Sequence, residues 1–188
     1  MKSRKHILID AENIIFSALN KNRELIRTKH TCTINNFPAQ SYFEPVVEAT
    51  LTKITGFDRS TDTIDIVVGY QNRSLIQQST KYQVHIAHDP QRTGIDNQAA
   101  DRFIRTKLIN LFWNFEARSN IILVSGDGGY LPSLLQLHDR GYAIQIVAPS
   151  WTLNHKYAQY FGSQVLQLDY RWLDDVRARI TRQKPRIH

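Results

Sequence analysis

The chain has 188 residues and a hydrophobic content of 41%, which suits one domain with a real core. Its longest apolar runs are only a few residues, which excludes a membrane-spanning helix. The single cysteine, Cys32, excludes an internal disulfide and a multi-cysteine zinc site. One cysteine fits a reducing compartment, so we expect a cytoplasmic protein that does not bind membranes.

The net charge of +7 is concentrated at the two ends of the chain. Lys2, Arg4 and Lys5 supply +3, and residues 171–188 supply +4 from six Lys or Arg and two Asp. The body between these ends is electrically balanced. Basic ends act either as solubilising segments or as contacts for an anionic partner such as a nucleic acid, and composition alone leaves both open.

In chain order, the first predicted strand is His6–Ile9, which ends at Asp10. The basic residues before it are not followed by a small-residue cleavage site, so we expect a strand there and not a signal peptide. Residues 21–40 are polar and predict a long surface loop, with a short hairpin around 31–34. Between strand and loop, a helix is marked by apolar residues at helical spacing: Ile14, Ile15, Ala18 and Leu19.

The next part of the chain alternates helices and strands. Apolar residues at helical spacing predict a helix over 41–55, and the β-branched run over 63–70 predicts a second strand. A short helix over 75–82 and a third strand over 83–87 follow.

Two acids mark the start of the helix that follows the loop 89–97. At 100° per residue, Asp101 lies about 20° from Leu108 on the apolar stripe of this helix. A carboxylate at such a position is costly unless a cation or hydrogen bonds compensate it, as in a structural ion pair or a functional site. Asp96 lies off the stripe at the helix start, where an acid also serves as an N-cap.

Residues 121–148 predict a strand–helix–strand unit whose crossover makes the strands parallel. The run 121–124 is the first strand, the turn 125–129 follows, and 143–148 is the second strand. Asp127 comes just after the carboxyl end of the first strand, where ligands bind in open parallel sheets. The helix between the strands has the predicted apolar stripe Leu131, Leu134, Leu135 and His138.

The remaining chain predicts a short helix ending at Gly162, a last strand over 165–168 and a terminal helix. Residues 182–188 are expected to fray. The whole pattern predicts an α/β fold: a Rossmann-like parallel sheet with helices on both faces, in a single domain over 1–170. A basic helix and tail over 171–188 follow this domain.

Asp10 and Asp127 each end a predicted strand. If these strands are neighbours, they lie about 4.8 Å apart, close enough for both acids to share a hard cation. Asp101 would approach from the adjoining helix. Three carboxylates without cysteine or paired histidine favour Mg²⁺ or Mn²⁺ over zinc, and such a site suits phosphodiester hydrolysis.

Three segments resemble a known family. Residues 7–13, ILIDAEN, resemble the opening motif of NYN domains, which belong to the PIN-like nuclease superfamily. Residues 124–130 together with Pro132 resemble the family's "SGDxDF-x-P" segment. Residues 98–103, QAADRF, resemble its middle segment, whose acid opens a helix. The resemblance extends from the first strand to about Leu168.

The resemblance implies a PIN-like sheet and a metal-dependent endoribonuclease whose partner is RNA. It implies metal ligation by Asp10, Asp101 and Asp127, with Asn13 as an orienting residue. Asp96 remains a competing alignment for the middle catalytic acid. Ser125 is expected both to orient the acids and to lie at the RNA, where the expected backbone contacts are Arg92, Arg102 and Arg105.

The sequence departs from the family at Gly129, where a second acid usually stands. Glu12 and Asp96 are candidates to replace that acid, although Glu12 is expected to be only solvated. One-metal hydrolysis and a catalytically silent module that binds RNA or another protein are both compatible with this departure. A third reading, a small-molecule phosphate enzyme, lacks the lysine of a P-loop. The sequence leaves assembly into a homo-oligomer open.

Overall fold

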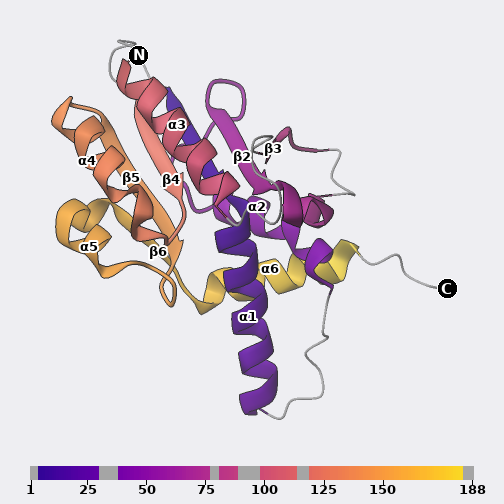
Figure 1. Cartoon of the computed structure of the whole chain (residues 1–188). Helices are drawn as coiled ribbons and strands as arrows, with labels where there is room; N and C mark the ends of the chain where they lie inside the picture. The colour runs from indigo at the N-terminus through magenta and orange to yellow at the C-terminus, as the bar shows by residue number, and fades with distance from the viewer. Residues whose placement is uncertain (1–3, 30–37, 77–80, 89–97, 114–118, 184–188) are drawn as a thin grey trace.

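The computed structural model describes residues 4–29, 38–76, 81–88, 98–113 and 119–183. Within these residues lies one six-stranded, all-parallel sheet with the strand order β3-β2-β1-β4-β5-β6 (Figure 1). The predicted α/β parallel sheet is therefore confirmed. The strands are β1 (Lys5–Asp10), β2 (Thr63–Gly69), β3 (Val84–Ala87), β4 (Asn120–Val124), β5 (Ala143–Pro149) and β6 (Val165–Leu168).

Helices cover both faces of the sheet, as predicted. One face packs against α1 (Ala11–Lys29), α2 (Phe43–Leu51) and α6 (Tyr170–Gln183). The other packs against α3 (Ala99–Trp113), α4 (Leu131–Asp139) and α5 (His155–Phe161). Short 3₁₀ turns join these elements: η1 (Ala39–Tyr42), η2 (Tyr70–Ile76), η3 (Gly128–Tyr130) and η4 (Gly162–Gln164).

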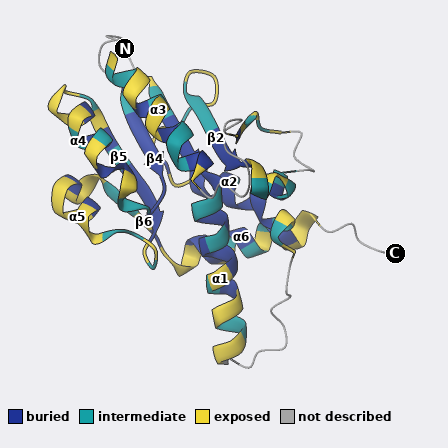
Figure 2. Ribbon diagram, in the orientation of Figure 1, coloured by how far each residue is buried: buried dark blue, intermediate teal, exposed yellow. Residues whose placement is uncertain are grey.

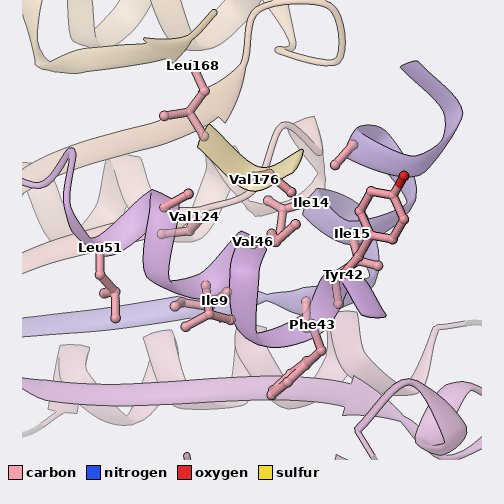
Figure 3. Close-up of a cluster of buried hydrophobic side chains, with 14 of the residues drawn as sticks. Ile9, Ile14, Ile15, Tyr42, Phe43, Val46, Leu51, Val124, Leu168 and Val176 are labelled. Carbon is pink, nitrogen blue, oxygen red and sulfur yellow. The ribbon is translucent and has the colours of Figure 1, made fainter. Parts of the chain in front are cut away.

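The core is divided by the sheet because successive strand residues point to opposite faces. In β1, Ile7 and Ile9 belong to the cluster under α1, α2 and α6, whereas Leu8 belongs to the cluster under α3, α4 and α5. Figure 3 shows the first cluster, in which Ile9 and Val124 from the strands lie around Val46 of α2. Burial on both faces explains why the strands are nearly continuous apolar runs.

The predicted loop over 21–40 is wrong for its first part, because α1 continues to Lys29. The cause is a tertiary contact: the buried Asn22 amide donates to the Tyr42 hydroxyl (2.8 Å) and accepts from Arg177 Nε (2.6 Å). Lysine, arginine and glutamate also favour helix. The last turns of α1 are largely exposed (Figure 2). The predicted hairpin around 31–34 and Cys32 lie outside the described residues.

Three other predicted elements change in detail. The helix expected over 41–55 is the shorter pair η1 and α2. Of the helix expected over 75–82, residues 75–76 end the 3₁₀ turn η2, and residues 77–80 lie outside the described residues. In α4, Leu137 is buried in place of the expected His138, because an apolar side chain suits the sheet face and the imidazole packs beside Phe161 at the edge.

Helix α6 is part of the core. Trp172, Leu173, Val176 and Ile180 are buried in the same cluster as β1, and Trp172 Nε1 donates to Thr50 Oγ1 at 3.2 Å. Among the described helices, none combines the length and apolarity that a lipid bilayer requires.

Candidate active site

The candidate site lies where the strand order of the sheet reverses. From β1 the chain builds β2 and β3 on one side, and it then returns to place β4 on the other side. β1 and β4 are hydrogen-bonded neighbours, with Ile9 opposite Val124, so the condition for Asp10 and Asp127 to lie close together is met. Open parallel sheets bind ligands at the carboxyl ends of strands at this switch point.

Asp10 is the last residue of β1, and it is only 3% exposed. Its Oδ1 accepts from the Asn13 backbone N–H (3.1 Å), and its Oδ2 accepts from Ser125 Oγ (3.2 Å) and from the Tyr130 hydroxyl (3.0 Å). Burial raises the pKa of Asp10 from 3.8 to about 6, although these hydrogen bonds oppose the rise. The three hydrogen bonds therefore fix the position of the carboxylate, but they compensate its negative charge only in part.

The buried Tyr130 hydroxyl lies between two carboxylates. It is 3.0 Å from Asp10 Oδ2 and 2.8 Å from Asp101 Oδ1. Because a phenol has one proton, it donates to only one of them at a time. Burial and the two acids raise the pKa of Tyr130, so the hydroxyl stays protonated. Tyr130 thus connects α3 to the end of β1. Sequence reasoning missed this role, although the position of Tyr130 three residues after Asp127 was a usable signal.

The turn after β4 is held by short polar contacts. Asn13 Oδ1 accepts from the Gly126 N–H at 2.9 Å, which supports the orienting role expected for Asn13. The fully buried Ser125 accepts from the Asp127 N–H at 3.2 Å, and Asp127 Oδ1 accepts from the Gly129 N–H at 2.9 Å. A Cβ atom at Gly126 would overlap the Thr152 carbonyl, so the turn needs glycine there.

The candidate acids line one cavity of about 480 Å³. Asp10, Asp101 and Asp127 all contribute to its lining, as does Glu12. Glu12, expected to be only solvated, instead has its Oε1 fixed by the Gly69 N–H at 2.5 Å. The other lining residues are Asn13, Phe16, Ser17, Asn20, Lys21, Glu24, Trp151 and Thr152.

The acids of the cavity do not form a preformed metal-coordination site in the described residues. Among the described residues, no group of three histidine, cysteine, aspartate or glutamate side chains is close enough to hold one ion. The donor chemistry nevertheless fits Mg²⁺, which is held in proteins through one or two carboxylates and keeps waters or substrate phosphates as its other ligands.

The Arg105 side chain lies beside Gly129, the position where the family usually has a second acid. A Cβ atom on Gly129 would lie 2.7 Å from Arg105 Nη2 and 3.4 Å from Asp127 Oδ1. The exposed Arg105 guanidinium therefore reaches the rim of the acidic site from α3. Arg102 is on the same helix and is partly buried. The expected residues Arg92 and Asp96 lie outside the described residues.

The parallel α/β sheet with acids at its switch point is the architecture of a PIN-like nuclease domain. The family model described as NYN domain matches residues 4–161, and the chain belongs to this family. The expected resemblance to NYN domains is thereby confirmed. No curated protein and no solved structure matches the chain. Membership supports a nuclease-like, RNA-related function.

Proposed function

We propose that the protein is a metal-dependent endoribonuclease that hydrolyses RNA with Mg²⁺ or Mn²⁺. The observation that carries this proposal is the convergence of Asp10, Asp101 and Asp127 on one cavity at the switch point of an NYN-domain sheet. Oxygen donors alone favour these hard cations over zinc.

Asp10 is the best candidate for direct ligation. Its buried carboxylate has a raised pKa, which means that the surrounding protein groups compensate its negative charge only in part. Asp101 and Asp127 would complete the site, directly or through bound water. When bound, the ion would activate a water molecule and offset negative charge on the phosphate.

The neighbouring residues have distinct roles in this proposal. Asn13 and Ser125 position the turn and the Asp10 carboxylate through their hydrogen bonds. Because Ser125 is fully buried and its hydroxyl bonds within the protein, we assign it a positioning role. Arg105 is exposed at the rim and would hold the RNA phosphate, since a guanidinium binds phosphate in a bidentate manner.

The test uses a circular, internally labelled RNA, which has no ends and is cut only by an endonuclease. The parent is compared with Asp127→Asn and with Asp139→Asn, a control at a side chain that is 81% exposed. We expect cleavage with Mn²⁺ or Mg²⁺, none with EDTA, loss of cleavage in Asp127→Asn and full activity in Asp139→Asn. Cleavage that persists in EDTA or in Asp127→Asn would refute the proposed mechanism.

A second candidate is a catalytically silent RNA-binding module. It is favoured by one observation: the Arg105 guanidinium, a cation, occupies the space beside Asp127 that a side chain at Gly129 would enter. This alternative predicts RNA binding that is the same in EDTA and in Asp127→Asn, with the circular RNA intact in every sample.

A further inference from the structure

Two aromatic rings and a lysine lie together at one rim of the acidic cavity. Trp151, in the turn after β5, and Lys21 of α1 both line this cavity. Tyr170, the first residue of α6, stacks beside Trp151 with ring centroids 5.6 Å apart and ring planes 31° apart. Lys21 Nζ is 5.6 Å from the centroid of the Tyr170 ring. The three residues, here called the aromatic rim, come from three separate elements.

The aromatic rim is packed against the core at Trp151 and exposed at Tyr170. Trp151 Nε1 donates to the Ser17 carbonyl at 3.4 Å, and the fully buried Trp172 lies 6.1 Å from Trp151 between ring centroids. Tyr170, by contrast, is 51% exposed. Core packing explains Trp172 and the inner part of Trp151, but it leaves half of the Tyr170 side chain in water beside an acidic cavity.

The charge of the aromatic rim is already balanced. Lys21 Nζ is 2.6 Å from Glu24 Oε1, and this hydrogen bond raises the pKa of Lys21. The pair adds no net charge, so attraction of phosphate is a poor explanation for the rim. What it offers a ligand is the exposed part of the Tyr170 ring, which contacts Trp151 and Lys21.

We propose that the aromatic rim binds an unpaired base of single-stranded RNA by stacking on Tyr170. The identity of the ligand as RNA rests on the function proposed above. Aromatic side chains stack on any base, because every base has a π face, but the base has to be free of its own helix. The rim therefore selects single-stranded over duplex RNA for the neighbouring acidic site.

The test measures base stacking without cleavage. A single-stranded oligoribonucleotide containing 2-aminopurine is titrated in EDTA with the parent, with Tyr170→Leu and with Tyr160→Leu. Tyr160 is a matched control, because it is 53% exposed and, unlike Tyr170, makes no ring contact with Trp151 among the described residues. We expect binding to quench 2-aminopurine in the parent and the control, and the affinity of Tyr170→Leu to be about 5-fold to 100-fold weaker, with the quenching lost.

Two further measurements sharpen the test. The affinity ratio between parent and Tyr170→Leu should stay the same at low and high salt, since stacking does not release counterions as phosphate contacts do. The parent should also bind a duplex of the same sequence much more weakly than the single strand. Equal affinity of parent and Tyr170→Leu, retained quenching, or equal binding of duplex would overturn the proposal, as would a parent that binds no RNA.

Cleavage assays on the same RNA in Mn²⁺ separate this proposal from the hydrolytic one. Stacking that depends on Tyr170 without any cleavage would overturn only the hydrolytic proposal. Cleavage that depends on Asp127 but is unaffected by Tyr170→Leu, on single strands and duplexes alike, would overturn only the stacking proposal.

Discussion

Replacing Asp10 by asparagine is expected to stabilise the metal-free protein at neutral pH and to abolish hydrolysis. The carboxyl is 3% exposed, and burial raises its pKa from 3.8 to about 6. The folded protein thus binds the Asp10 proton more tightly than the unfolded chain does. The contribution of Asp10 to the stability of the folded state is therefore fully present below pH 3.8. It is lost as the pH rises through about 6, where the buried carboxyl ionises.

The size of the effect follows from the two pKa values. A shift of one pKa unit corresponds to about 1.4 kcal/mol, so the ionised Asp10 costs the folded state about 3 kcal/mol at neutral pH. Asparagine keeps the shape but accepts fewer hydrogen bonds, which costs about 1 kcal/mol. The net gain of about 2 kcal/mol corresponds to an increase in Tm of about 4–8 °C for a chain of this size.

The assay is thermal unfolding in EDTA at about pH 7.5 and about pH 4.5, with Asp139→Asn as the exposed control. Most of the increase in Tm of Asp10→Asn over the parent should disappear at the lower pH, because Asp10 of the folded parent carries its proton there. Added Mn²⁺ should stabilise the parent and leave Asp10→Asn unchanged. A lower Tm of Asp10→Asn at the higher pH, or an equal gain at both, would refute the reasoning.

Three further predictions concern the same site. Tyr130→Phe removes a hydrogen bond that lowers the pKa of Asp10, so the acidic limb of the pH–rate profile should move to higher pH. Asn13→Ala removes the acceptor of the Gly126 N–H, and urea denaturation should show a free energy of unfolding lower by about 1–3 kcal/mol. Arg105→Gln should weaken RNA binding and reduce the salt dependence of log Kd by about one ion, as measured by anisotropy titrations.

Each of these three predictions has a contrary outcome. An unchanged pH profile in Tyr130→Phe would mean that the hydroxyl does not tune Asp10. Unchanged stability of Asn13→Ala would mean that water replaces the lost acceptor. Lys53→Gln, at an exposed lysine that does not line the cavity, is the control for Arg105→Gln, and equal effects of the two would show only a general charge effect.

The strands and the acids that end them could be predicted because their signals are local. A strand buried on both faces is an apolar run. Asp10 directly follows such a run, and Asp127 comes three residues after the end of another. Asp101, which lies near the apolar stripe of its helix, was expected to approach them from that adjoining helix, and it lines the same cavity. The choice of Asp101 over Asp96 as the catalytic acid stays a prediction.

The features that the sequence did not reveal depend on partners far along the chain. The end of α1 is helical because Asn22 meets Tyr42 and Arg177, which lie 20 and 155 residues away. Glu12 accepts a hydrogen bond from the N–H of Gly69, 57 residues away, and no local sequence pattern predicts that contact. Patterns in a short window detect periodicity, whereas these contacts exist only once the sheet has assembled.

The family match ends at residue 161, but the folding unit does not. Helix α6 begins nine residues later and buries Trp172, Leu173 and Val176 against the sheet. A chain cut at the family boundary would expose this apolar surface to water, which favours aggregation. Such a cut would also remove Tyr170. Any exchange of NYN segments between proteins must therefore transfer α6 as well, or the hybrid will lack both a closed core and this ring.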